Sequence, residues 1–299
     1  MKKTALITGA TSGLGLALVK QLVRHKDIHF ILPVRDIKRG QQLVSTFSGA
    51  QQERIRLLEM DLADLATVRA AADSLHTPID ILIFNAGVQS AETTIYTKDN
   101  LEQTFAVNHL AHFVLLRKLE NLLTDEAIIG WVGSGTHHPE LAKAFGFTGA
   151  HYRDPELLAK GQYHSEANTR QSSRDAYATS KGLNIFMARY LASRGSSRSY
   201  FAIDPGLMPG TGLAREGSLG LRLAWKYVLP MAAKFMKGTS TPKRSAAMLA
   251  RVLLKDKKIT SGDYVEYTGH LLEPFMPQDE TAYGQRLFDY SDGFVAPGS

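Results

Sequence analysis

The sequence predicts an α/β fold built on a doubly wound parallel sheet with helices on both faces. Short apolar runs alternate with segments whose apolar residues recur at helical spacing. A glycine-rich turn joins the first apolar run to the first helical segment, and 44% of the 299 residues are hydrophobic. Repeated strand–helix units connected right-handedly build such a sheet, and a chain of this length can bury the core that it requires.

Six apolar runs are the expected strands: Ala5–Ile7, Phe30–Leu32, Ile55–Leu58, Ile81–Phe84, Ala127–Ile129 and Tyr200–Ile203. Between them, Gly15–Arg24 and Leu62–Leu75 have helical periodicity. No repeat or low-complexity linker divides the chain, so residues 1–299 are expected to form one domain. Two excursions, at about 135–174 and 207–241, are longer than a crossover needs. Functional loops or a substrate lid are expected there, with structural padding as the alternative.

Composition excludes several classes of site. The chain has no cysteine, which rules out disulfides and thiolate chemistry and is consistent with the cytoplasm. Its formal net charge is +6, but the basic residues are scattered, so no nucleic-acid partner is expected. The most apolar segment, Leu219–Met236, is interrupted by Arg222, Lys226 and Lys234, so no stable membrane insertion is expected.

The turn after the first expected strand is rich in glycine, with a Gly-x3-Gly-x-Gly spacing that differs from the commoner G-x-G-x-x-G fingerprint. Glycines there permit a tight turn and the close approach of a pyrophosphate, whose charge is favoured by the free N–H groups at a helix start. A glycine-rich turn alone is weak evidence, but its place at the first strand–helix junction strengthens it. The residues expected to bind the cofactor here are Gly9, Thr11, Ser12, Gly13, Leu14 and Gly15.

The end of the second expected strand bears on which dinucleotide binds. Arg35 lies about 20 residues beyond the last glycine of the turn, where the adenosine ribose is expected. A guanidinium there suits a 2′-phosphate, so Arg35, with Arg39, favours NADP(H) over NAD(H). Two alternatives remain: both arginines are ordinary surface cations, or Asp36 binds the ribose hydroxyl of NAD.

Tyr177 and Lys181 are the candidate proton-transfer pair. They are four residues apart and therefore share one face of a helix. An ammonium close to the phenol favours the phenolate and lowers the pKa of the tyrosine. The spacing alone is weak evidence, but Ser134 follows an apolar strand, at the carboxyl end where α/β proteins bind ligands. Its hydroxyl can polarise a substrate oxygen, although a turn or cap role is the alternative.

The ordered set of motifs resembles the short-chain dehydrogenase/reductases, which have a Rossmann-type fold. The resemblance covers roughly Lys3 to Tyr267. The residues that carry it are Thr8-Gly9-x3-Gly13-x-Gly15, Asp61-Leu62, Asn85-Ala86-Gly87, Asn108, Ser134, Tyr177-x3-Lys181 and Pro205-Gly206.

The resemblance implies further roles for single residues. Asp61 and Leu62 would lie beside the adenine, and Asn85, Ala86 and Gly87 would support the cofactor, with a structural role for Asn85 as the alternative. Asn108 would position a water in a proton relay, and Lys181 would also hold the ribose. The resemblance also places the nicotinamide against Pro205, Gly206 and Thr211.

Within the family, Val107–Phe113 and Pro205–Leu213 resemble the retinol dehydrogenase and light-dependent protochlorophyllide reductase branch. The latter group carries a cysteine after the Pro-Gly pair, where this chain has Leu207. We therefore expect a carbonyl reductase or alcohol dehydrogenase that acts on a bulky apolar small molecule. The alternatives are an NADPH-dependent C=C reductase and a non-enzymatic NADP(H)-binding regulator. Homodimer, homotetramer and monomer all remain open.

Four histidines in the first excursion raise the question of a metal site. His137, His138, His151 and His164 are irregularly spaced and have no cysteine partners, so we expect surface histidines and no metal.

Overall fold

The computed structural model describes residues 2–90, 94–143, 146–163, 169–208 and 238–296. Seven strands form one parallel sheet in the order β3-β2-β1-β4-β5-β6-β7. Their bounds are β1 (Lys3–Ile7), β2 (Ile28–Val34), β3 (Ile55–Glu59), β4 (Ile79–Phe84), β5 (Leu123–Val132), β6 (Ser199–Asp204) and β7 (Tyr264–Glu266). This arrangement confirms the predicted doubly wound parallel sheet.

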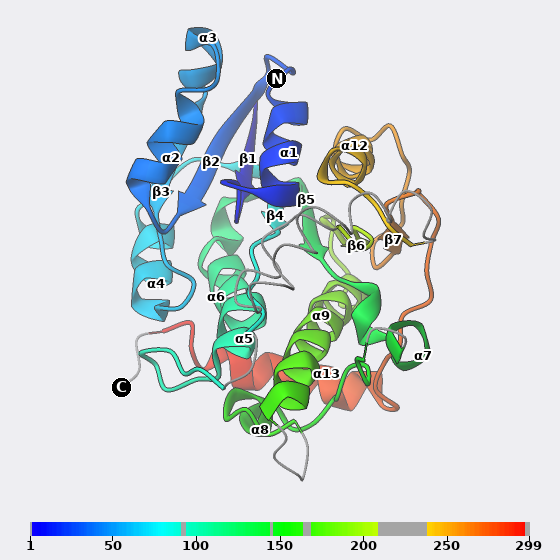
Figure 1. Ribbon diagram of the computed structural model, residues 1–299. Coiled ribbons are helices and arrows are strands. Elements are labelled where there is room, and N and C mark those ends of the chain that lie inside the picture. The colour runs from blue at the N-terminus through cyan, green and yellow to red at the C-terminus, as the bar shows by residue number, and fades with distance from the viewer. Residues whose placement is uncertain (1, 91–93, 144–145, 164–168, 209–237, 297–299) are drawn as a thin grey trace, which may run out of the picture.

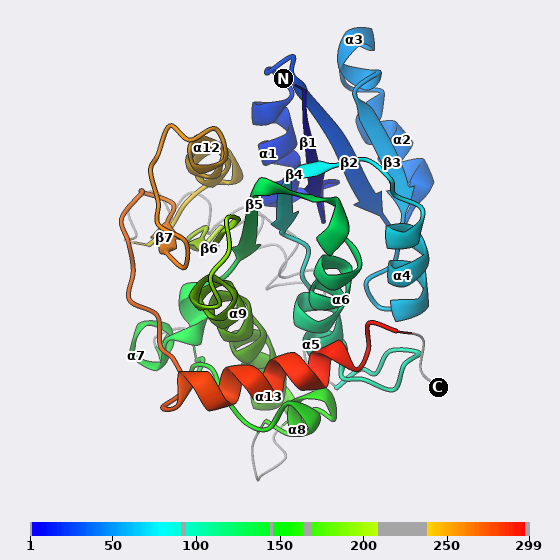
Figure 2. The ribbon, with the colours of Figure 1, turned by 180° about the vertical axis from the view of Figure 1, so that it is seen from behind.

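Helices cover both faces of this sheet (Figures 1 and 2). One face carries α1 (Gly13–Leu22), α2 (Ile37–Val44) and α12 (Pro242–Leu253); the other carries α4 (Leu65–Asp73), α6 (Ala111–Lys118) and α9 (Thr169–Ser193). The remaining helical segments are α3 (Gly49–Gln52), α5 (Gln103–Phe105), the π-helical turn η1 (Ala106–Leu110), η2 (Glu120–Leu122), η3 (Gly135–His137), α7 (Pro139–Ala142), α8 (Pro155–Ala159) and α13 (Glu280–Asp292).

The pleat of β1 shows why the sheet needs two helical layers. Successive side chains of a strand point to opposite faces. Leu6 packs into the core beneath α4, α6 and α9, whereas Ala5 and Ile7 pack into the core beneath α1 and α12. All three side chains are fully buried. The continuous apolar run in the sequence therefore matches a central strand that is covered on both sides.

The C-terminal helix α13 crosses the outer surface of α6 and α9 (Figure 2). The Phe288 ring meets Phe113 of α6 edge to face at 5.1 Å between centroids, and Tyr283 meets Phe186 of α9 at 5.4 Å. Asp292 accepts a 2.9 Å ion-paired hydrogen bond from Arg117 Nε. These contacts place α13 over α6 and over α9, which bears Tyr177 and Lys181.

Each of the six expected strands lies within an observed strand, and the two expected helices match α1 and α4 to within three residues. Two differences concern the sheet. β5 begins at Leu123, four residues before the expected start, because Leu123 pairs with Ile79 across a register irregularity. β7 was not expected from the sequence, and its three residues are too few to show a periodic pattern. Within the described residues, no helix is both long and apolar enough to cross a membrane.

Candidate active site

The loop after β1 is held in shape by its neighbours on β4. Gly9 and Gly13 have φ values of 68° and 55°, in the left-handed region that favours glycine. The Asn85 amide donates hydrogen bonds to the backbone carbonyls of Thr8 (2.9 Å) and Gly9 (3.2 Å). A side chain at Gly15 would place its Cβ 2.6 Å from that amide nitrogen. Asn85 therefore has the structural role that the sequence left as an alternative.

The start of α1 is open to an anion. Ser12 is the N-cap residue, but its side chain makes no capping hydrogen bond, and the first turn carries no acidic residue. The N–H groups at this end are those that a phosphate group can accept from. Thr11 and Ser12 are half-buried, whereas the Leu14 side chain is 5% exposed and packs into the core. Leu14 can therefore contribute to this loop through its backbone alone.

The end of β2 carries exposed cations. Arg35 and Arg39 are both exposed, and neither forms an ion pair with a described residue. Asp36 caps α2, and its carboxylate accepts a hydrogen bond from the Arg39 backbone N–H at 3.1 Å. A capping carboxylate of this kind stabilises the helix start. Asp36 therefore has a structural partner, and the guanidinium groups of Arg35 and Arg39 remain available to bind an anion at the end of β2.

The carboxyl end of β3 forms a turn that Thr67 braces. The Asp61 N–H donates to Thr67 Oγ1 at 3.0 Å, and that hydroxyl donates back to the Asp61 carbonyl at 2.9 Å. The Asp61 carboxylate accepts from the Ala63 N–H at 3.0 Å. Leu62 is half-buried against the core. The site beside the expected adenine is thus ordered by local hydrogen bonds.

Three elements meet at Gly87, after the end of β4. A Cβ at Gly87 would lie 3.3 Å from both Asn108 Oδ1 and Lys181 Nζ. The Asn108 amide oxygen accepts from the Val88 N–H at 2.7 Å, and its Nδ2 donates to the Val88 carbonyl and to Ser180 Oγ, each at 2.9 Å. The fold therefore brings the β4 loop, the π-helical turn and α9 together at one point.

Tyr177 and Lys181 lie on one face of α9, as their spacing predicts. The Lys181 ammonium lies 5.6 Å from the centre of the Tyr177 ring and donates to the Val132 carbonyl at 3.1 Å. Both side chains are buried, at 7% and 4% exposed. Ser134 follows β5 and accepts hydrogen bonds from the Thr136 N–H (3.3 Å) and hydroxyl (3.1 Å). These contacts orient the serine beside the end of the strand.

Burial changes the proton affinity of both groups. It raises the pKa of Tyr177, the half-buried Asp204 carboxylate raises it further, and the interaction with Ser134 opposes this rise. Burial also lowers the pKa of Lys181 to about 8. The sequence-based expectation that the Lys181 ammonium lowers the pKa of Tyr177 is therefore wrong for this geometry. Desolvation of the phenol is the largest cause of the shift, and the hydrogen bond of the ammonium goes to the Val132 carbonyl.

The Pro205-Gly206 turn follows β6. Gly206 has a φ of 71°, and its N–H donates to Asp204 Oδ1 at 2.9 Å. Ser245 Oγ donates to the Pro205 carbonyl at 2.6 Å, which anchors the turn on α12. Leu207 pairs with Thr239 in a short parallel bridge. Thr211 and the segment Leu219–Met236, the expected nicotinamide contact and substrate lid, lie outside the described residues.

Three residues near this site were not selected from the sequence. His112 contacts the Thr8 hydroxyl, and Asp204 acts on the pKa of Tyr177. Phe147, from the first excursion, packs against the Tyr177 ring at 6.2 Å between centroids. Asp204 had a sequence signal, because a carboxylate directly after an apolar strand stands at the ligand-binding edge. Phe147 had none, since its position depends on how the excursion folds back.

Two histidines of the first excursion, His137 and His151, form side-chain hydrogen bonds within the protein, and His164 lies outside the described residues. His137 was expected at the surface but is 1% exposed, which corrects that expectation. Its Nδ1 pairs with the Ser134 carbonyl at 2.7 Å, and its Nε2 accepts from the Phe275 N–H at 3.2 Å, so both ring nitrogens are used. In the part of the chain that the structure describes, no three histidine or acidic side chains are grouped as metal ligands.

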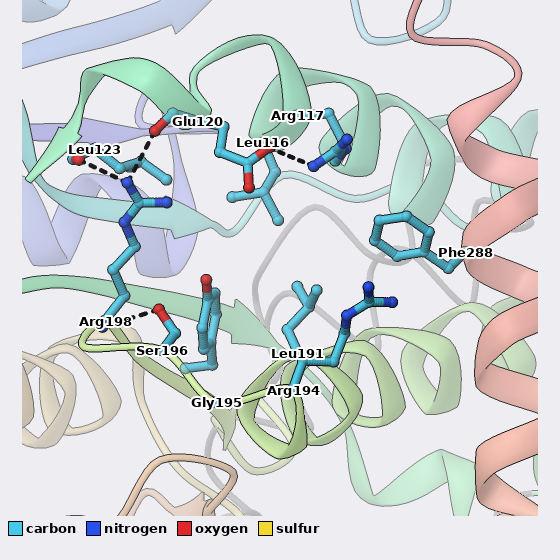
Figure 3. A pocket seen from close by; sticks show the side chains of 11 residues that line it. Leu116, Arg117, Glu120, Leu123, Leu191, Arg194, Gly195, Ser196, Arg198 and Phe288 are labelled. Carbon is cyan, nitrogen blue, oxygen red and sulfur yellow. Dashed lines mark hydrogen bonds and ion pairs between the residues drawn. The ribbon is translucent and has the colours of Figure 1, made fainter. Parts of the chain in front are cut away.

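A pocket at the other edge of the sheet is lined by three arginines (Figure 3). It lies at the starts of β5 and β6, opposite the edge that bears Ser134 and Pro205. Arg117 is ion-paired with Glu120, Arg198 donates to the Glu120 carbonyl at 3.0 Å, and Arg194 lies 4.9 Å from the centre of the Phe288 ring. These arginines stabilise the fold, and the pocket is remote from the candidate catalytic groups.

The chain resembles several known proteins. A family model described as short chain dehydrogenase matches residues 3–132. The short-chain dehydrogenase iccH of Talaromyces variabilis is 31% identical over 77% of this chain and 76% of its own. Chloroplastic protochlorophyllide reductase B of Oryza sativa subsp. japonica is 31% identical over 88% and 69%. Retinol dehydrogenase 12 of Mus musculus is 29% identical over 88% and 77%.

Solved structures show the same fold. A putative uncharacterized protein from Mycobacterium paratuberculosis has a TM-score of 0.68 at 24% identity, covering 99% of this chain and 94% of that one. The NADPH-bound carbonyl reductase from chicken fatty liver has a TM-score of 0.62 at 19% identity, covering 91% and 98%. Together with the sequence relatives, the sheet order and the convergence of the ordered motifs, these matches show that the chain belongs to the short-chain dehydrogenase/reductase family of oxidoreductases.

Proposed function

We propose that this protein interconverts a carbonyl and an alcohol on a bulky apolar small molecule, with NADP(H) as the cofactor. The observation that supports this proposal best is the convergence of Ser134, Tyr177 and Lys181 at one edge of the sheet, beside the glycine-rich loop. A phenol, a hydroxyl and an ammonium are the groups needed to move a proton at a substrate oxygen.

The loop fits a dinucleotide. Gly15 has no room for a side chain against Asn85, and the start of α1 has no acidic side chain in its first turn. Both features favour a pyrophosphate against the N–H groups of this helix. When bound, the nicotinamide would supply or accept the hydride at the substrate carbon. Arg35 and Arg39 would hold a 2′-phosphate, and the NADP-bound carbonyl reductase of the same fold supports this preference.

The proton would move at Tyr177 Oη. In the reducing direction the phenol gives its proton to the carbonyl oxygen, and in the oxidising direction it takes one from the alcohol. The raised pKa keeps Tyr177 protonated near pH 7, which is the form that can donate a proton. Ser134 would polarise the same oxygen. Lys181, with a pKa of about 8, would return the proton from solvent to the site, and Asn108 would position a water beside it.

An apolar substrate is supported by what packs around the phenol. The half-buried Phe147 ring lies against Tyr177, so the excursion contributes an aromatic surface next to the reacting group. Aromatic walls favour ligands with large apolar area. The relative named retinol dehydrogenase 12 supports the same substrate class.

The similarity to protochlorophyllide reductases supports a second candidate, hydride transfer to an activated C=C bond. Tyr177 would then protonate carbon or an enolate oxygen. Leu207 weighs against this chemistry, because it places an aliphatic side chain where that group of enzymes carries a thiol. Deuterium-labelled NADPH separates the candidates: carbonyl reduction leaves the label on a carbinol carbon, and C=C reduction leaves it on a saturated carbon that bears no hydroxyl.

The test of the leading candidate is NADPH oxidation with a panel of aldehydes and ketones of increasing apolar size. Wild-type protein should turn over the larger members, and Tyr177→Phe should lose about 10²- to 10⁴-fold in kcat, because only the proton donor is removed. Tyr96→Phe is the matched control, since that exposed phenol lies in a different region. Full activity in Tyr177→Phe would refute the mechanism. NADPH binding without turnover of any substrate would support a non-enzymatic regulator.

A further inference from the structure

His112 connects the glycine-rich loop to the π-helical turn η1, which bears Asn108. Its side chain is fully buried in α6 and lies 4.9 Å from the Phe84 ring, between centroids. The ring nitrogen Nε2 is 3.2 Å from Thr8 Oγ1, and Nδ1 is 3.1 Å from the Asn108 carbonyl oxygen. One imidazole therefore contacts both the residue before Gly9 and the backbone of Asn108.

The partners of His112 determine which nitrogen carries the proton. A hydroxyl has one donor and two acceptor positions. Thr8 Oγ1 already accepts from the N–H groups of Asn85 and Ala86, each at 3.0 Å. Its own hydrogen is therefore directed to His112 Nε2, with the Ile83 carbonyl at 3.4 Å as the longer alternative.

The contact at Nδ1 of His112 indicates the same tautomer. A backbone carbonyl can only accept, so Nδ1 must donate to the Asn108 oxygen. A neutral imidazole with its hydrogen on Nδ1 satisfies both contacts at once. An imidazolium would direct a second N–H at a Thr8 hydroxyl whose acceptor positions are occupied. Burial and the nearby Lys181 also lower the pKa of His112, to about 3, so the ring is neutral near pH 7.

The contact continues beyond Asn108 to Tyr177. Asn108 Nδ2 donates to Ser180 Oγ at 2.9 Å, and that hydroxyl donates to the Tyr177 carbonyl at 2.8 Å. The links form two pairs, Thr8 to His112 to the Asn108 backbone carbonyl, and the Asn108 side-chain amide to Ser180 to the Tyr177 carbonyl, which the covalent frame of Asn108 joins. Within each pair the donor-to-acceptor direction is the same, and hydrogen bonds aligned in this way polarise and strengthen one another.

We propose that His112 is a positioning residue that fixes the glycine-rich loop relative to the helix turn of Tyr177 through this chain of hydrogen bonds. The role rests on the proposed function, because it sets the distance between the cofactor loop and the proton donor. His112 touches no reacting atom. It acts by fixing the position of the glycine-rich loop relative to the Tyr177 phenol.

The first experiment measures the tautomer directly. Nitrogen-15 NMR of histidine-labelled protein, with the His112 signals assigned by their loss in His112→Phe, should show a neutral ring protonated on Nδ1 between pH 6 and 8. An imidazolium, or a ring protonated on Nε2, would overturn the proposal. This readout needs no turnover, so it remains informative if the proposed carbonyl chemistry is wrong.

The second experiment distinguishes the contribution of the Nδ1 contact of His112 from that of its Nε2 contact. His112→Phe keeps an aromatic ring against Phe84 and removes both polar contacts. We expect NADPH affinity and kcat each to fall roughly 3- to 10-fold, the range for one ordinary hydrogen bond. His112→Asn retains a donor at the Nδ1 position and should recover part of kcat. His112→Gln retains an acceptor at the Nε2 position and should recover part of the NADPH affinity.

The matched control is His109→Phe. His109 lies on the same helical segment and is also buried, but it packs against Phe105 and contacts neither Thr8 nor the Asn108 carbonyl. Equal effects of His109→Phe and His112→Phe would overturn the proposal in favour of general packing. If His112→Phe does not fold, the Asn and Gln variants carry the test, and identical kcat and NADPH affinity in both would refute it. If wild-type protein binds NADPH but reduces no carbonyl, the proposed function fails while the affinity comparison still tests His112.

Discussion

The Lys181 ammonium lies 5.6 Å from the centre of the Tyr177 ring, yet its hydrogen bond goes to the Val132 carbonyl. Both groups are desolvated in the same place, and neither neutralises the other. Burial lowers the pKa of Lys181 and raises that of Tyr177, so each favours its uncharged form. Near pH 7 Tyr177 is neutral, so the cost in stability comes from Lys181, whose charged form burial disfavours.

Lys181→Met should stabilise the protein while abolishing turnover. The folded-state pKa of Lys181 is about 8 and its ordinary value is 10.5, so keeping it charged below pH 8 costs about 3 kcal/mol. The gain in the free energy of unfolding should be largest below pH 8 and should disappear above about pH 10.5. Denaturant unfolding at pH 7 and pH 10 measures it. Lys160→Met, an exposed control, should change little at either pH.

Asp204→Asn should move the pH profile of alcohol oxidation to lower pH. Ionised Asp204 raises the pKa of Tyr177, and burial raises the pKa of Asp204 itself. The charge of Asp204 therefore acts on Tyr177 in the alkaline part of the pH profile. Removing the carboxylate should lower the pKa of Tyr177 and shift the rising limb of kcat by roughly one pH unit. Glu266→Gln is the control, since it removes a charge on the neighbouring strand. Equal shifts in both variants would contradict a specific effect of Asp204.

Arg35→Glu should reverse the cofactor preference. A guanidinium bonded to a 2′-phosphate contributes about 1.5–3 kcal/mol, so NADPH affinity should fall roughly 10- to 150-fold while NADH affinity changes little. Lys38→Glu makes the same charge change three residues further along, on the exposed side of α2. Titration of both variants with both cofactors measures the preference. The assignment to Arg35 is wrong if Lys38→Glu gives the same loss.

Gly15→Ala should prevent the loop from closing around a cofactor. The added methyl would lie 2.6 Å from Asn85 Nδ2, whereas a methyl at Gly49, also near a helix start, would meet nothing within 4 Å. We expect Gly15→Ala to destabilise the fold by about 1–3 kcal/mol and Gly49→Ala to be neutral or slightly stabilising. Thermal unfolding with and without NADPH measures this. A normal cofactor-induced increase in Tm for Gly15→Ala would show that the loop tolerates the methyl.

Phe147→Ala should narrow the substrate range. The ring packs against Tyr177, so its loss removes apolar surface next to the reacting group. We expect kcat/KM for large apolar carbonyls to fall roughly 10-fold or more, with a smaller change for small aldehydes. Leu141→Ala, at an exposed position of the same excursion, is the control. An equal loss across all substrates would indicate a general distortion of the site.

The fold and the meeting point of the site were predictable because both depend on local signals. Strand and helix periodicity located the sheet, and Ser134 follows from its place at the end of β5. Tyr177 and Lys181 share a face of α9 because four residues are close to one helical turn. For these residues the order along the chain determines the edge of the sheet at which they meet.

The remaining features depend on contacts between distant segments. The direction of the pKa shift of Tyr177 follows from its burial and from Asp204, 27 positions along the chain. The burial of His137 depends on Phe275, and the tautomer of His112 depends on which groups occupy the Thr8 hydroxyl. Sequence spacing carries no information on these contacts, because each is created when separate elements pack.

The placement of α13 also has a consequence for how the chain is made. The outer surfaces of α6 and α9 are completed by Tyr283, Leu287 and Phe288. From the end of α6 at Lys118 to the start of α13 at Glu280, a further 162 residues (280 − 118) must be synthesised. At a synthesis rate of roughly 5–20 residues per second, α13 is completed on the order of 10 to 30 s after α6, and until then it cannot pack on the apolar surface of α6. During that interval the nascent chain exposes an aggregation-prone surface, on which chaperones would act.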